Sequence, residues 1–315
     1  MMGFGLVLAC AGEPSLERLE YRSIRMGTEV RILLYAEQEA GAAAAAGEAF
    51  HRIAHLDSLF SNYRTDSEIA QLAFVAGAEP LVVSDELIIV MQRALGLARE
   101  TDGAFDPSVG PLTALWRNAR RTGTQPDSLD LARAALLVDW QAIELDTVAR
   151  TIRLARPAMR LDLGGIAKGH AADEALEILR THGFPRALVS FGGEIVAGEA
   201  PPGEAGWTVR SDLLPDSTFV LANRALSVSG DTEQFLVVEG VRYSHVIDIG
   251  TRRGLANGAS ATVLARDGMT ADALATAVSL LAGERQLRFV AAHPEATFML
   301  PRGRDQRHAK PPPGG

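Results

Sequence analysis

One stretch decides the fold: Asp162-Leu-Gly-Gly-Ile-Ala-Lys168-Gly-His170. A carboxylate precedes a glycine-rich turn, and the turn leads into an expected helix at 167–181. Glycines let the backbone approach a phosphate closely, and the first N–H groups of a helix point at it. The sequence therefore predicts an anion-binding turn, although tight packing between a strand and a helix would use the same glycines.

A second stretch, Thr270-Ala-Asp272-Ala-Leu-Ala-Thr276, places a carboxylate and a hydroxyl four residues apart on an expected helix. Residues at that spacing share one helix face, where we expect Asp272 to be exposed. Two oxygen ligands suit a hard cation such as Mg²⁺, although an acid in the first turn also favours the helix dipole without a metal. Both stretches together indicate a nucleotide substrate and phosphoryl chemistry.

Composition narrows the function classes. The chain has 315 residues, of which 47% are hydrophobic, enough for one large domain or two small ones. Its net charge is -8, and without a basic stripe this argues against a nucleic-acid partner. Arg117, Arg120 and Arg121 form the one basic cluster. We interpret them as a solvated helix face, with nucleotide phosphate binding as the alternative.

Strand and helix patterns occur without a regular βαβ alternation, which predicts the α+β class. Periodicity and turn residues predict strands at 20–35, 187–191, 207–210, 225–229, 236–249 and 260–264, a hairpin at 138–154, and one or two last strands within 288–300. They predict helices at 37–60, 84–100, 167–181 and 270–281, and a short helix with Ser67 near its cap.

The N-terminus indicates a lipid anchor. The apolar run Phe4-Gly-Leu-Val-Leu-Ala-Cys10 is followed by small residues, as in a bacterial lipoprotein signal that is cleaved before the cysteine. No Lys or Arg precedes the run, which argues against this interpretation. We expect a signal and linker at 1–20, lipidation of Cys10, and a location on the periplasmic side of a bacterial membrane. The tail at 302–315 is charged, then proline-rich, and is expected to be disordered.

Several short motifs follow one another along the chain. Each motif alone is weak evidence for a protein family, but their joint order is specific. They are Met26-Gly-Thr28, Ser61-Asn-Tyr63 with Asp66-Ser-Glu68-Ile69, Gly103-Ala-Phe-Asp-Pro107, the Asp162 turn, Gly192-Gly193-Glu194, Ser229-Gly-Asp231, His245-Val-Ile-Asp248, and Asp272 with Thr276. In these motifs the chain resembles the ApbE-type FAD:protein FMN transferases, formerly described as thiamine-biosynthesis lipoproteins. The resemblance extends over nearly all of the chain after residue 20.

The resemblance implies a single α+β domain at 21–301, T-fold-like, with mixed sheets and packed helices. It also implies an FAD substrate, a Mg²⁺ requirement, and transfer of FMN to a threonine or serine hydroxyl of an acceptor flavoprotein, with AMP released. The positions at which the family holds FAD fall on Met26, Tyr63, Ala104, Phe105, Asp106, Asp162, Lys168 and Ile247. Those at which it holds Mg²⁺ fall on Asp272, Thr276 and the backbone carbonyl of Gly165.

The family's reactive histidine falls at His245. Transfer to a hydroxyl needs a base near the acceptor oxygen, and imidazole suits that role at neutral pH. Asp248 either orients His245 as a second catalytic residue or simply begins the following turn.

The chain departs from the family pattern at several positions. Ile249-Gly250-Thr251-Arg252 replaces the usual Pro-x-Thr-Gly, so we expect a different turn in which Gly250 supplies the unusual backbone angle. Thr232 replaces a frequent tyrosine, and Ala275 replaces a second acid. These changes keep two alternatives open: an FAD pyrophosphatase that forms FMN and AMP, and a lipid-anchored flavin-binding protein without catalysis.

Overall fold

The computed structural model describes residues 16–211, 214–230, 235–238, 240–256 and 260–300. The expected signal with Cys10, the tail at 302–315, and the pair Asp231 and Thr232 lie outside the described residues. Within the described ranges, no helix combines the length and apolar character needed to cross a membrane.

The largest sheet has seven strands in the order β1-β2-β6-β7-β10-β14-β15. Neighbouring strands in it pair antiparallel. The α+β class is confirmed, whereas the mixed character expected of the sheets is limited, in the described chain, to one isolated parallel bridge between Val109 and Arg160. The strands are β1 (Glu17–Arg25), β2 (Thr28–Ala36), β6 (Ala187–Phe191), β7 (Glu194–Ala197), β10 (Arg224–Ser229), β14 (Ala261–Ala265) and β15 (Thr297–Met299).

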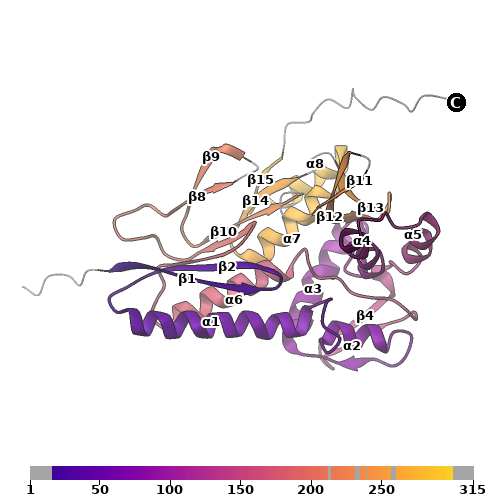
Figure 1. The fold of residues 1–315 in the computed structure, drawn as a ribbon, viewed down its shortest axis with the longest axis horizontal. Coiled ribbons are helices and arrows are strands. Elements are labelled where there is room, and N and C mark those ends of the chain that lie inside the picture. Colours follow the sequence, from indigo (N-terminus) through magenta and orange to yellow (C-terminus); the bar gives the residue numbers. More distant parts are fainter. Residues whose placement is uncertain (1–15, 212–213, 231–234, 239, 257–259, 301–315) are drawn as a thin grey trace, which may run out of the picture.

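The two faces of this sheet are covered differently, because successive side chains of a strand point to opposite faces. On β2, Val30, Ile32 and Leu34 join the main core, whereas Leu33 packs in a second cluster with Trp207. Figure 1 shows the helices α1 and α6 on one side of the sheet and the β8–β9 hairpin on the other. These elements are α1 (Glu39–Phe60), α6 (Ala167–Thr181), β8 (Trp207–Ser211) and β9 (Leu214–Leu221).

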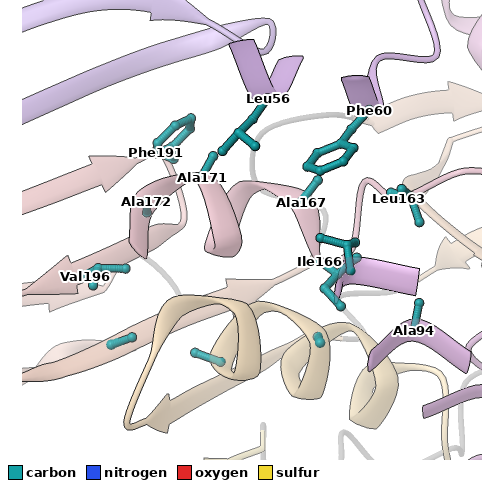
Figure 2. Packing of buried hydrophobic residues seen from close by; sticks show 14 of the residues in the cluster. Leu56, Phe60, Ala94, Leu163, Ile166, Ala167, Ala171, Ala172, Phe191 and Val196 are labelled. Atoms are coloured by element: carbon teal, nitrogen blue, oxygen red, sulfur yellow. The ribbon is translucent and has the colours of Figure 1, made fainter. Parts of the chain in front are cut away.

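Small side chains bring α1 close to α6. One face of α1 buries a row of alanines before Leu56 and Phe60 near its end. Figure 2 shows Leu56 and Phe60 against Ala167 and Ala171 of α6. This packing brings the end of α1 beside the glycine-rich turn that precedes α6.

Helix α7 (Gly268–Ser279) crosses α6 where two glycines meet. A Cβ atom on Gly169 would overlap the Gly268 carbonyl oxygen, and one on Gly268 would lie 2.6 Å from the Gly169 carbonyl oxygen. Each of the two helices also contributes a carboxylate that accepts hydrogen bonds from backbone amides of the other helix. Asp173 of α6 accepts hydrogen bonds from the Gly268 and Met269 amides at 2.6 and 2.8 Å, and Asp272 of α7 accepts one from the Gly169 amide at 3.0 Å.

Two three-stranded sheets and five further helices complete the described fold. The helix cap predicted at Ser67 is confirmed, since its hydroxyl accepts a hydrogen bond from the Ala70 amide. The Ser84 hydroxyl caps α3 in the same way and accepts a hydrogen bond from the Leu87 amide. The sheets are β3-β5-β4 and β11-β12-β13, formed by β3 (Leu81–Val82), β4 (Ile143–Asp146), β5 (Thr151–Leu154), β11 (Phe235–Val238), β12 (Val241–Asp248) and β13 (Arg253–Ala256). The helices are α2 (Glu68–Phe74), α3 (Asp85–Glu100), α4 (Gly110–Thr122), α5 (Ser128–Ala135) and α8 (Gly283–Ala292), with a 3₁₀ turn at Trp140–Ala142.

Two expected strands are wrong in detail, and the last strand expected within 288–300 is confirmed over a narrower range. The segment 20–35 belongs to a hairpin, because Met26 and Gly27 adopt positive φ values of 48° and 75° that fit a two-residue turn between antiparallel strands. The segment 236–249 also belongs to a hairpin, with its turn between β11 and β12. The segment 288–300 begins within α8, and only Thr297–Met299 forms a strand.

Candidate active site

A cavity of about 480 Å³ collects residues that are far apart in the sequence. It is bounded by the β1–β2 turn, the end of α1, helix α4, the glycine-rich turn, strand β12 and the end of α7. Of the residues predicted for the site, those that line it are Met26, Tyr63, Ala104, Phe105, Asp106, Asp162, Gly165, Lys168, His245, Ile247 and Thr276. Asp272 lines a smaller adjoining recess instead, and Asp248 lines neither space.

Asp162 organises the glycine-rich turn. Its Oδ1 accepts a hydrogen bond from the Gly164 amide at 2.9 Å. Its Oδ2 accepts one from the Thr113 hydroxyl at 2.7 Å and lies 3.5 Å from Arg117 Nη2. Both carboxylate oxygens therefore have protein partners, and the carboxylate fixes the turn against α4.

The segment Ala104–Asp106 is held by its own turn. Asp106 is buried, and its Oδ1 accepts hydrogen bonds from the Ser108 amide at 2.7 Å and the Ser108 hydroxyl at 2.6 Å. Its Oδ2 accepts one from the Trp140 amide at 3.0 Å. Burial raises the pKa of the Asp106 carboxyl, although these hydrogen bonds favour its charged form. The bonds hold the neighbouring Phe105 at the cavity wall.

Lys168 has a carboxylate partner, as an unfavourable lysine in a first helical turn requires. Its Nζ lies 2.7 Å from Oε2 of Glu194, which is buried at the start of β7. The sequence alone leaves open whether Gly192-Gly193-Glu194 ends a strand or forms a ligand loop. In the structure the two glycines form the β6–β7 turn, and Glu194 lines the recess together with Asp272.

Asp272 differs from the sequence prediction of an exposed side chain. The residue is only 3% exposed, because α7 is surrounded by core residues. Burial raises the pKa of the Asp272 carboxyl, and the positive charge of Lys168 together with hydrogen bonds from the Gly169 and Lys168 amides counteracts that rise. Its partner on the same helix, Thr276, reaches both the recess and the main cavity.

The arginines of α4 do not form the solvated helix face that the sequence predicts. Arg117 and Arg120 line the cavity, and of the three only Arg121 stays exposed, bonded to Asn118. The Arg117 guanidinium lies 4.1 Å from the ring centroid of Tyr63, whose residue is 70% exposed at the cavity rim. Burial lowers the pKa of Arg120, and its hydrogen bond to Tyr63 acts in the opposite direction. The spacing of Thr113, Arg117 and Arg120, which places them on one helix face, is the sequence signal that identifies this wall.

His245 and Asp248 separate in the structure. His245 lines both the cavity and the recess. Asp248 accepts hydrogen bonds from the Gly250 amide at 2.8 Å and the Thr251 hydroxyl at 3.0 Å, which favours its interpretation as a turn residue. The left-handed residue of this turn is Arg252, with a φ of 59°, so the expectation for Gly250 is wrong.

These features define a class: an α+β protein in which a glycine-rich turn, two arginines of α4 and Thr276 line one cavity, with Asp272 in an adjoining recess. The chain belongs to the ApbE family, whose model matches residues 26–300. It is 31% identical to the FAD:protein FMN transferase of Treponema pallidum (strain Nichols), over 93% of this chain and 87% of the relative. It is 30% identical to that of Vibrio cholerae, over 94% and 91%.

Solved structures agree with this relationship. The flavin transferase ApbE from Vibrio cholerae matches with a TM-score of 0.78 and 27% identity, covering 91% of this chain and 94% of that one. The ApbE protein from Thermotoga maritima matches with a TM-score of 0.80 and 28% identity, covering 90% and 94%. The family and the α+β fold expected from the motifs are confirmed.

Proposed function

We propose that this chain transfers FMN from FAD to a threonine or serine hydroxyl of an acceptor flavoprotein and releases AMP. The family and the names of the relatives support this activity. The observation that carries the proposal is that residues of most of the separate family motifs meet in this cavity and its adjoining recess. Its volume of about 480 Å³ suits a dinucleotide held partly in solvent.

The oxygen donors beside the glycine turn fit Mg²⁺. A Cβ atom on residue 165 would lie 3.0 Å from the Thr276 hydroxyl oxygen, so glycine alone allows this close approach of backbone and hydroxyl. Asp272 adds a buried carboxylate from the same helix as Thr276. Gly165, Asp272 and Thr276 would hold the ion, which when bound supplies positive charge to the pyrophosphate and the AMP leaving group.

The chain's own residues have separate tasks in this reaction. Lys168 binds phosphate oxygens through its ammonium group. His245 accepts the proton of the acceptor hydroxyl, whose oxygen forms a bond to the FMN-side phosphorus while the bond from that phosphorus to the AMP oxygen breaks. The apolar wall with Phe105 and Ile247 packs against a flat ring system and excludes water.

Two variants test the roles. Asp272→Ala should abolish FMN transfer, and because the residue is buried it should also lower the melting temperature.

His245→Ala should bind FAD almost normally and transfer FMN slowly. Mass spectrometry of a co-expressed candidate acceptor measures the FMN adduct, and flavin fluorescence measures binding. Full transfer by Asp272→Ala would contradict the metal assignment, and lost FAD binding in His245→Ala would make that histidine structural.

The altered turn at 249–252 motivates the hydrolytic alternative. Incubation of the purified protein with FAD and Mg²⁺ in the absence of an acceptor separates the two activities. Rapid release of AMP would identify an FAD pyrophosphatase. Bound flavin that never releases AMP, even with acceptors present, would identify the flavin-binding protein without catalysis.

A further inference from the structure

A small recess adjoins the proposed metal position, and four of its side chains come from α6, β7 and α7. Asp272 and Thr276 of α7 lie on one side, Lys168 of α6 and Glu194 of β7 on the others. Glu194 is 4% exposed and Asp272 is 3% exposed. The recess therefore brings together the buried carboxylates of Asp272 and Glu194 and the ammonium group of Lys168.

Glu194 is fixed in this recess by its hairpin. It follows the two-residue turn Gly192–Gly193 and pairs with Phe191 of β6. Gly193 packs so tightly that a Cβ atom there would lie 2.9 Å from the Val228 carbonyl oxygen. The hairpin therefore cannot shift easily, and the carboxylate of Glu194 stays at the recess.

Helix α7 itself contributes a single carboxylate here. Ala275, the residue before Thr276, is fully buried in the main core. An acid at position 275 would thus enter apolar surroundings in this chain. Glu194 is a carboxylate from a different element that reaches the same recess as Asp272 and Thr276.

We propose that Glu194 is the second carboxylate of the metal centre, and that Lys168 occupies it until a divalent cation binds. Cation entry then replaces the Lys168–Glu194 ion pair, because the carboxylate exchanges a single positive charge for a double one. The released ammonium group of Lys168 moves to the phosphates in the adjoining cavity, which Lys168 also lines. This inference rests on the proposed function and adds a residue and an order of events to it.

Binding of Mn²⁺ to the purified protein without nucleotide tests the proposal, with free Mn²⁺ measured by electron paramagnetic resonance. Glu194→Gln should weaken Mn²⁺ affinity by at least about 10- to 100-fold, the loss that follows when a residue that only supports a metal ligand is removed. Lys168→Met should strengthen Mn²⁺ affinity several-fold, because the competing ammonium group is absent. Glu199→Gln is the matched control, since it makes the same change at an exposed residue after β7.

The outcomes separate this inference from the proposed function. If Asp272→Asn loses Mn²⁺ while folded Glu194→Gln keeps wild-type affinity, Glu194 is outside the centre and only the inference fails. If Lys168→Met binds Mn²⁺ no better than the wild type, the displacement is wrong. If the wild type itself binds no Mn²⁺, both the inference and the metal assignment fail. Should Glu194→Gln unfold, Glu194→Asp keeps the charge, shortens the side chain, and is expected to retain intermediate affinity.

Discussion

Some side chains at the cavity can contact a ligand, and others hold those side chains in place. Tyr63 and Arg117 are an example of such a pair. The ring of Tyr63 lies at the rim, where a flat ligand ring can stack on it, yet its position depends on α4. Arg117 lies over the ring and also contacts Asp162 through Nη2. Arg117 is therefore a positioning residue that links the aromatic wall to the glycine-rich turn.

Replacing Arg117 tests this role. Arg117→Gln should weaken FAD binding by about tenfold, because a cation–π contact contributes roughly 0.5–2 kcal/mol and Tyr63 loses its support. The rate at saturating FAD should change less than the affinity. Flavin fluorescence titration measures the first quantity and FMN transfer the second. Arg121→Gln, on the exposed side of the same helix, is the control and should bind FAD like the wild type.

The pKa of the Asp173 side chain makes the free energy of unfolding depend on pH. Desolvation raises the pKa of the Asp173 carboxyl from 3.8 to about 7, although the Gly268 and Met269 amides favour its charged form. Between pH 3.8 and about pH 7, the Asp173 carboxyl keeps its proton in the folded chain and has lost it in the unfolded chain. The contribution of Asp173 to stability is therefore largest below about pH 4 and falls as the pH rises towards 7.

Asp173→Asn removes this titration. We expect the stability of the variant relative to the wild type to increase between pH 5 and pH 7, by at most about 1.4 kcal/mol per pH unit. Urea unfolding of both proteins at several pH values gives the difference. A difference that stays constant over this range would mean that Asp173 keeps its ordinary pKa in the folded chain.

At the scale of elements, the crossing of α6 and α7 positions the proposed metal and phosphate residues together. Gly169 and Gly268 allow the two backbones to touch, and Asp272 reaches the Gly169 amide only because of that approach. The same crossing carries Lys168, which lies one residue before Gly169. The spacing of two helices thus controls the geometry of the site.

A methyl group at this crossing should separate the helices. Gly169→Ala is expected to destabilise the fold by roughly 1–3 kcal/mol, as overpacking does, and to weaken divalent-cation binding. Thermal unfolding and Mn²⁺ titration measure the two effects. Gly96→Ala in α3 is the control, because an added Cβ atom there would meet nothing within 4 Å, and it should be neutral or stabilising by about 1 kcal/mol. Equal behaviour of the two variants would contradict the tight crossing.

At the scale of the whole molecule, the cavity exists because distant parts of the chain pack around one sheet. The β1–β2 turn comes from the N-terminal end of the described chain and α7 from near its C-terminal end, and both reach the same space. We propose further that the domain is tethered to the periplasmic side of a bacterial membrane by a lipid on Cys10. An acceptor at the same membrane would then meet the cavity at high effective concentration.

The anchor is testable with the full chain. Expressed in a bacterial host, the wild type should incorporate labelled fatty acid and enter the detergent phase on Triton X-114 partitioning. Cys10→Ser should remain in the aqueous phase with unchanged FMN transfer to a soluble acceptor. A wild-type chain that stays aqueous and unlabelled would exclude the lipid anchor.

The sequence by itself determined the family, the α+β class and most of the elements. The helix at 167–181 and the strand at 187–191 follow directly from local pattern, because periodicity and turn residues act over a few positions. It also named most of the residues around the cavity, since the motifs keep a fixed order. Local pattern failed where pairing mattered, because the hairpins at 17–36 and 235–248 have the alternation of single strands.

Only the tertiary structure decided which charges face each other. The sequence pattern predicts solvated side chains for Arg117 and Arg120 and an exposed one for Asp272, because a sequence shows the face of a helix but not what covers it. The pairing of Lys168 with Glu194 joins residues 26 positions apart through α6 and the β6–β7 hairpin. Burial and pairing of charges depend on packing between elements, and packing is set by the whole fold rather than by any local stretch.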